Sequence, residues 1–140
     1  MKKWRLLPHA GEAFIEAWGD TIEEAHENAA KAFYDVMCDV EKIESKISRE
    51  ITVSGEDWME AFYNFINELI FIFDTEELVF GDFKIKIIKN KEWHIIANAR
   101  GEKYDIKKHN WKVGIKAVAF HGMELIKEDD KWKIRYILDI

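Results

Sequence analysis

Two short segments hold the side chains of this sequence best suited to a chemical role. Residues 8–12, Pro-His-Ala-Gly-Glu, have neither strand nor helix character and end on the carboxylate of Glu12. At the other end of the sequence, an apolar strand would hold Asp139 and the α-carboxylate of Ile140 as two fixed anionic groups. A third carboxylate beside them would complete an oxygen-rich site suited to calcium or magnesium. Spacing alone leaves open whether Asp139 is a ligand or a solvated terminal residue.

Familiar catalytic arrangements are missing from the sequence. Four of the five histidines are isolated, and no predicted helix carries a His-x-x-x-His or Glu-x-x-His pair. There is no Gly-rich phosphate loop, no Gly-x-Ser-x-Gly elbow and no Cys/His nucleophile pair near a helix terminus. The single cysteine, Cys38, excludes an internal disulfide framework and a cysteine-rich zinc site. The residues by themselves therefore indicate no complete catalytic constellation.

Composition and charge narrow the class of protein. The 140 residues are 48% hydrophobic and 34% charged, which suits one globular domain over residues 1–140. No apolar run approaches the roughly 18 residues that span a bilayer, and the basic N-terminus is not followed by a signal-peptide core, so we expect a cytoplasmic protein without membrane contact. The net charge of −6, with its acidic excess in residues 1–60, argues against strong direct nucleic-acid binding. An acidic surface of this kind is either solvated or contacts a basic partner.

Two helices are predicted to position these residues. Thr21 and Glu24 match a capping box, and apolar residues follow at helical spacing as far as Met37. A second helix is predicted to start after residues 54–57, Ser-Gly-Glu-Asp, and to run to about Phe73. Because its apolar residues cover much of its circumference, we expect the second helix to be the more buried one.

The remaining segments alternate with the period of strands. Strands are predicted around residues 14–18, 46–53, 83–87, 93–99, 115–126 and 132–138, with turns at 89–92 and 128–131. Lys116 has apolar neighbours on both sides, so its strand is expected to be central. The fold class is therefore α+β, an antiparallel or mixed β-sheet with two main helices packed on it.

Several segments together resemble the archease family. They lie throughout the chain, at residues 8–12, 15–21, 35–37, 101–109, 115–121 and 139–140. The family's opening motif reads His-Thr-Ala-Asp-x-Gly, whereas this chain has Ala10, Gly11, Glu12 and Phe14 at the corresponding places. Its Thr-Tyr-His segment is similar to residues 119–121, Ala-Phe-His. The departures concentrate in the loop where the resemblance places a metal ligand.

The resemblance implies an archease-like fold and a specific function. Archeases are non-enzymatic cofactors of the tRNA-splicing RNA ligase, which promote its guanylylation, allow multiple turnover and broaden its nucleotide use. The implied metal site is Glu12, Asp139 and Ile140, with calcium as the expected ion because its coordination tolerates the longer Glu12 side chain. Lys116 corresponds to a lysine needed for ligase activation, and His9, His109 and His121 would support the site.

Two other functions remain as alternatives. Some archeases are described as chaperone-like modulators of a tRNA methyltransferase, which implies a second possible protein partner. The same carboxylates could also serve a small metal-dependent phosphoesterase, in which His109 or His121 would have to act as the general base.

Overall fold

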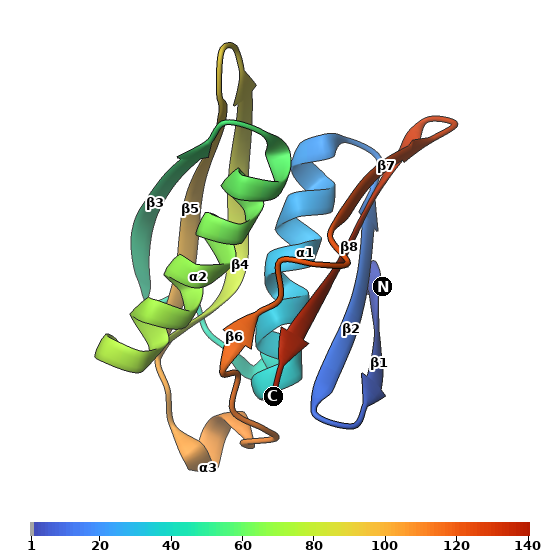
Figure 1. Ribbon diagram of the computed structural model, residues 1–140. Helices are drawn as coiled ribbons and strands as arrows, with labels where there is room; N and C mark the ends of the chain where they lie inside the picture. Colours follow the sequence, from blue (N-terminus) through green and yellow to red (C-terminus); the bar gives the residue numbers. More distant parts are fainter. Residues whose placement is uncertain (1) are drawn as a thin grey trace.

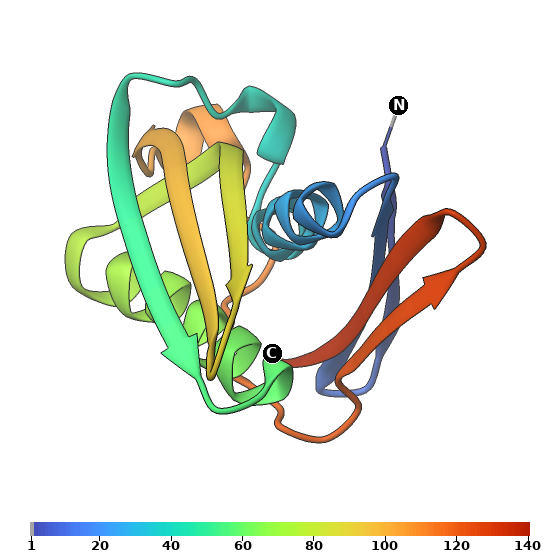
Figure 2. The same ribbon diagram turned by 90° about the horizontal axis from the view of Figure 1, so that it is seen from above.

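Two antiparallel β-sheets and two long helices make up the computed structural model, which describes residues 2–140 (Figures 1 and 2). The first sheet, sheet A, has the order β1-β2-β8-β6, and β7 also pairs with β8. Its strands are β1 (Trp4–His9), β2 (Glu12–Gly19), β6 (Ala117–Val118), β7 (Glu124–Glu128) and β8 (Lys131–Asp139). The second sheet, sheet B, has the order β3-β5-β4 and consists of β3 (Ile47–Gly55), β4 (Leu78–Lys89) and β5 (Trp93–Lys103). The predicted α+β class is confirmed, with the strands divided between two sheets.

Helix α1 (Ile22–Met37) lies between the two sheets, as the view from above shows (Figure 2). Its N-cap is Thr21, whose hydroxyl accepts a hydrogen bond from the Glu24 N–H at 3.0 Å, as predicted. The Glu24 carboxylate pairs with Lys3 at 2.5 Å. Both sheets approach the helix closely because small residues, Ala25, Ala29, Ala30 and Ala32, face them fully buried.

Helix α2 (Trp58–Glu76) packs on sheet B and on the strand β6. Its N-cap is Asp57, which accepts from the Glu60 N–H at 2.9 Å, so the predicted helix start is confirmed. The expectation that this helix is the more buried one is wrong. One of its faces is open to solvent, where Phe71 is 59% exposed, whereas α1 is covered on two sides. Hydropathy alone does not reveal how many neighbours a helix has.

The strand predictions are confirmed in sheet B and only partly confirmed in sheet A. Turns 89–92 and 128–131 connect β4 with β5 and β7 with β8. Strand β1 was not predicted, and the predicted strand 115–126 is wrong, since only 117–118 and 124–128 are strands. A turn at His121 and Gly122, where φ is +80°, interrupts it. The strand beside Lys116 therefore lies at the edge of sheet A, and β8 lies at the centre.

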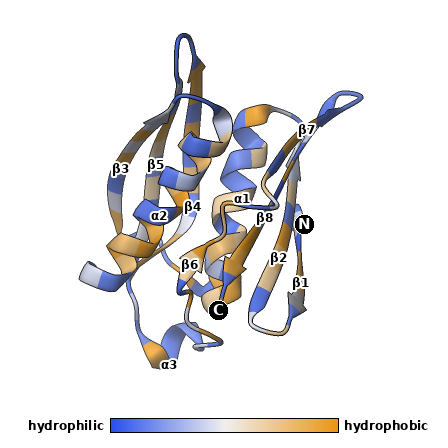
Figure 3. Cartoon of the chain, in the orientation of Figure 1, coloured by the Kyte–Doolittle hydropathy of each residue, from blue (hydrophilic) through white to orange (hydrophobic). Residues whose placement is uncertain are grey.

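The buried apolar residues form one core cluster, and the tips of the β4–β5 and β7–β8 hairpins are hydrophilic (Figure 3). The β1–β2 turn, the C-terminus and the short helix α3 (Ile106–His109) lie at one end of the molecule, opposite the tips of the β4–β5 and β7–β8 hairpins (Figure 1). A 3-10 turn, η1 (Val40–Lys42), connects α1 to the start of β3. Within residues 2–140, none of the helices is long and apolar enough to cross a membrane.

Candidate functional site

Strand pairing brings Glu12 and Asp139 together from opposite ends of the sequence. Strands β2 and β8 are antiparallel neighbours, and their register places Glu12 directly opposite Asp139. Residues in this relation have Cβ atoms about 5 Å apart and project from the same face of the sheet. Ala13 and Leu138 form the next pair and point into the core. Glu12 and Asp139 therefore project from the outer face of sheet A, where both are half-buried.

Backbone hydrogen bonds hold the C-terminal residues against this pair. The Ile140 N–H donates to the carbonyl oxygen of Gly11 at 3.0 Å, and the Lys116 N–H donates to the carbonyl oxygen of Asp139 at 2.8 Å. Gly11 turns the chain from β1 into β2 with a φ of +73°, a conformation that favours glycine. The last residues are thus held from two sides.

The two carboxylates have no cationic partner in the described part of the chain. Neither Glu12 nor Asp139 forms an ion pair within 4.0 Å, although like charges opposite each other on a sheet destabilise the pair. Residues 2–140 contain no cluster of three His, Cys, Asp or Glu side chains that could hold a metal. The resemblance implies that the third donor is the carboxylate of Ile140, the residue next to Asp139. Such a hard-oxygen donor set fits calcium or magnesium, and metal binding stays a prediction.

Lys116 lies beside the carboxylates through its backbone. It precedes β6, which pairs with the end of β8, and Ala117 is the partner of Asp139. Its side chain is exposed and forms no ion pair with any of residues 2–140. The ammonium group is therefore available to an anion from outside the molecule.

Two of the predicted supporting histidines are exposed and differ in their distance from the site. His9 is the β1 partner of Glu12, and its ring stacks on Phe14 with centroids 5.8 Å apart. His121 lies in the turn between β6 and β7. The structure thus places His9 next to Glu12, but gives His121 no contact with the carboxylates.

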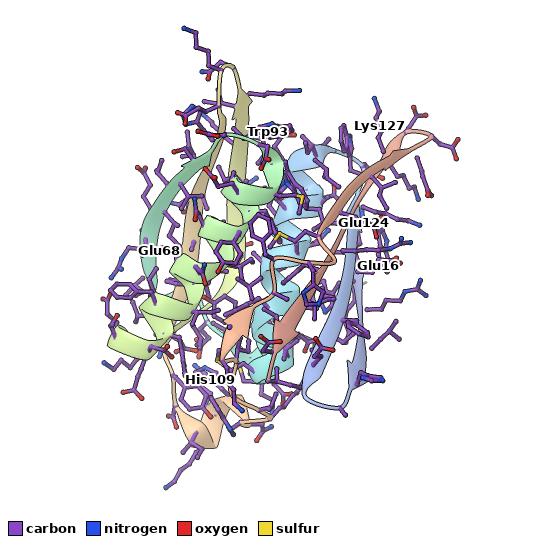
Figure 4. All side chains as sticks on the ribbon, in the orientation of Figure 1. Glu16, Glu68, Trp93, His109, Glu124 and Lys127 are labelled. Atoms are coloured by element: carbon purple, nitrogen blue, oxygen red, sulfur yellow. The ribbon has the colours of Figure 1, made fainter. Side chains whose placement is uncertain are left out.

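His109 has a structural position in α3, where it is fully buried (Figure 4). Its Nδ1 accepts a hydrogen bond from the Asp105 N–H at 2.9 Å, so that nitrogen carries no proton. The hydrogen therefore lies on Nε2, which donates to Glu102 Oε2 at 2.9 Å. Both ring nitrogens are engaged, so His109 holds α3 in place and is not free to bind a metal or to act as a base.

Glu102 is the centre of this second polar cluster. Burial raises the pKa of its carboxyl, but hydrogen bonds from the Glu44 N–H, Lys108 and His109 lower it to about 2. The ionised carboxylate thus connects β5, the segment before β3 and α3. Sequence reasoning noted Glu102 only through the resemblance. Lys108 and His109 lie six and seven residues further along the chain, but the Glu44 N–H comes from a segment 58 residues away.

An apolar groove on the outer face of sheet A was also missed. Its volume is about 270 Å³, and Leu7, Phe14 and Ile137 line it. At one side the buried Glu16 accepts hydrogen bonds from Arg5 and Arg135, and Glu16 and Glu124 project from this face in Figure 4. The alternation of residues 12–19 would have indicated which of them face outward, but not that β1 lies beside them.

Comparisons with known proteins agree with one another. Residues 4–140 match the model of the Archease protein family (MTH1598/TM1083). The chain is 42% identical to "Protein archease" of Pyrococcus abyssi and 40% identical to that of Pyrococcus furiosus, in both cases over the whole of both chains. The solution structure of protein 1598 of Methanobacterium thermoautotrophicum is 37% identical, with a TM-score of 0.86 over all of both chains.

A more distant structure shares the fold. It is described as an archease, possible chaperone, from Thermotoga maritima, and has a TM-score of 0.62 at 18% identity. The superposition covers 96% of this chain and 94% of that one. The fold of this chain is thus found well beyond the range of clear sequence similarity.

Proposed function

This chain belongs to the archease family, and we propose that it is a non-enzymatic protein cofactor that activates the tRNA-splicing RNA ligase. In this role it promotes guanylylation of the ligase, allows multiple turnover and broadens nucleotide use. The observation that carries the proposal is the unpaired carboxylate pair of Glu12 and Asp139 at one end of the molecule.

The position of this pair suits entry into the cleft of a partner. The carboxylates project from the open face of sheet A, next to a tight turn, and backbone hydrogen bonds fix the C-terminal residues. Glu12, Asp139 and the Ile140 carboxylate would hold a divalent cation, for which we propose calcium. A bound ion of this kind supplies the positive charge that nucleotidyl transfer needs near a triphosphate.

Glu12 and Lys116 would act differently within this site. Glu12 replaces the family's aspartate and adds one carbon–carbon bond, about 1.5 Å, to the reach of the carboxylate. Calcium accommodates such a change more easily than magnesium because its geometry is flexible. The exposed ammonium of Lys116 would pair with an anionic group of the ligase–nucleotide complex.

The other two functions receive less support. For the phosphoesterase alternative, one of the two candidate general bases is excluded. His109 is buried, and both of its ring nitrogens form hydrogen bonds within the protein. The description "possible chaperone" belongs to the Thermotoga maritima protein, whose similarity to this chain shows the fold alone.

Multiple-turnover RNA ligation by the cognate ligase tests the proposal. At fixed GTP and metal, we expect the wild-type chain to raise the product well above one turnover per ligase. Asp139→Asn and Glu12→Gln should abolish the acceleration, whereas Asp130→Asn, a matched change in the exposed β7–β8 turn, should retain it. No acceleration by the folded wild-type chain would disprove ligase activation, and equal activity of Asp139→Asn would disprove the role of the carboxylates.

A further inference from the structure

The connection between β5 and β6 is strongly basic in an acidic protein. Residues 103–116, from the last residue of β5 to the start of β6, which we call the basic connection, contain five lysines and one acidic residue, Asp105. The whole chain, in contrast, has 21 Lys and Arg residues against 27 Asp and Glu residues. The basic connection includes α3 and lies at the same end of the molecule as the C-terminus (Figure 1).

The backbone of the basic connection is anchored along its length. The Tyr104 N–H donates to Glu77 O at 2.7 Å, and the Lys112 N–H donates to Met37 O at 2.8 Å. His109 O accepts from the Asp39 N–H at 2.8 Å, and the Lys116 N–H bonds to Asp139 O. These contacts with distant residues hold a largely irregular segment in one shape, so its exposed side chains are presented in fixed positions.

Three of the five lysines form no ion pair with the residues that the structure describes, Lys116 among them, and two are already neutralised. Lys108 pairs with Glu44 and Glu102, and Lys112 pairs with Asp35. Lys103 and Lys107, by contrast, are exposed and form no ion pair with any residue that the structure describes. Lys103 borders a hollow of about 560 Å³. Asp105, which also lines this hollow, accepts a hydrogen bond from the backbone N–H of Lys107, and the Lys107 side chain remains exposed.

An aromatic ring accompanies the free lysines. Trp111 stacks on Phe73 with centroids 5.9 Å apart and an interplanar angle of 23°, and it meets the Tyr104 ring edge-on at 5.6 Å. It nevertheless remains 43% exposed. A ring held by two neighbours and still open to solvent can stack with a planar group from outside at little entropic cost.

We propose that the basic connection binds single-stranded RNA, with Lys103 and Lys107 at phosphates and Trp111 stacked on a base. The free lysines and the exposed ring belong to one anchored segment, in which Tyr104, the neighbour of Lys103, contacts Trp111. Lysines and an exposed ring match the two recurring contacts of single-strand recognition, to the backbone and to the bases. An acidic segment of a partner protein would pair with the lysines, but it has no planar base to stack on the Trp111 ring. The proposal rests on the proposed function in one respect, that the ligase supplies RNA at this end of the molecule.

The acidic residues in the rest of the chain weaken binding of RNA to the basic connection. A net charge of −6 repels phosphates at long range, so the isolated chain should bind RNA weakly and with a marked salt dependence. The contact gains strength where a partner already holds the strand, because binding then becomes intramolecular. A weak site of this kind is consistent with the absence of strong direct nucleic-acid binding that the composition predicts.

Amide NMR of the isolated chain, titrated with the single-stranded decamer U10 at low salt, tests the proposal without the ligase. We expect shift changes concentrated in residues 103–116. The double charge reversal Lys103→Glu/Lys107→Glu should weaken binding about tenfold and reduce the slope of log K against log salt by about 1.4, for two lost phosphate contacts. The matched pair Lys84→Glu/Lys86→Glu, two exposed lysines of β4 that form no ion pair with residues 2–140, should change the affinity less than twofold.

The contribution of the ring separates RNA from other anionic partners. Trp111→Ala should weaken binding of U10 about tenfold and leave an abasic strand of the same length unaffected. No shift changes at millimolar U10, changes scattered over the surface, or equal effects of the two lysine pairs would overturn the proposal. Equal affinity for a decaglutamate peptide would also overturn it, since the surface would then bind acidic protein segments. These results do not depend on whether the chain activates the ligase.

Discussion

His26 is a buried histidine that connects the two long helices. Its Nδ1–H donates to the Ile22 carbonyl at 2.7 Å, and its Nε2 accepts from the Trp58 indole N–H of α2 at 3.0 Å. Its ring is fully buried and also contacts Phe62. Burial lowers the pKa of His26 to about 4, against the opposing effect of the Ile22 hydrogen bond.

The lowered pKa predicts a loss of stability in mild acid. Between pH 6.5 and about 4 the unfolded chain protonates His26 and the folded chain does not, so the free energy of unfolding falls as pH falls. The expected loss is about 3 kcal/mol over that range, at roughly 1.4 kcal/mol per pKa unit. Urea unfolding at a series of pH values measures it. His26→Gln should flatten the profile, and His121→Gln, a change at an exposed histidine, should keep it; a profile that persists in His26→Gln would refute this assignment.

At the scale of elements, two glycines are required for different reasons. A Cβ at Gly101 of β5 would lie 1.8 Å from the Val79 carbonyl oxygen of β4, next to the irregularity in β4 between Phe80 and Asp82. Gly11 in the β1–β2 turn has no atom within 4 Å of its Cβ position, but its φ is +73°. The first glycine permits close approach of two backbones, and the second permits a left-handed conformation.

Because the two glycines are required for different reasons, substitution by alanine should lower the free energy of unfolding by different amounts. Gly11→Ala should lower the free energy of unfolding by about 1 kcal/mol, and Gly11→Asn by less, because asparagine tolerates positive φ. Gly101→Ala should cost more than about 3 kcal/mol or leave no folded protein, because backbone atoms cannot retreat. Urea denaturation and the soluble yield give the comparison. Similar costs for the two alanine variants would show that β4 can shift away from β5.

Elements whose signals are local were the predictable ones. Thr21 and Asp57 cap helices through residues three positions away, and the turns of the β4–β5 and β7–β8 hairpins are visible as short polar runs. Strand β1 has no such local signal, although its partner β2 follows it directly across the turn at Gly11. The two-residue strand β6 exists only through its pairing with the end of β8, which no local pattern indicates. The greater burial of α1 likewise follows from the sheet on either side of it.

At the scale of the whole molecule, the candidate site depends on sheet topology. Glu12 and Asp139 lie opposite each other only because β8 inserts between β2 and β6, an order that no local pattern indicates. The resemblance, and not spacing, brought them together in the sequence analysis. The resemblance also included His109 among the supporting residues, whereas the structure shows that His109 anchors α3. Sequence similarity alone does not distinguish a residue that anchors a segment from one that binds a ligand.

Because β2 and β8 form the centre of sheet A, a cation shared by Glu12 and Asp139 would stabilise the entire fold. A ligand that binds only the folded chain at a hundred times its dissociation constant adds about 2.7 kcal/mol, which corresponds to roughly 8 °C in Tm for a chain of this length. We therefore expect calcium to raise the Tm of the wild-type chain and of Asp130→Asn by that amount.

Asp139→Asn and Glu12→Gln should show no calcium-induced shift in Tm. Without metal, their Tm should equal or exceed that of the wild type, since each variant removes one of two facing negative charges. Magnesium should act more weakly than calcium, because the longer Glu12 side chain is less compatible with a strict octahedral shell. A calcium shift that survives in Asp139→Asn would place the ion elsewhere in the molecule.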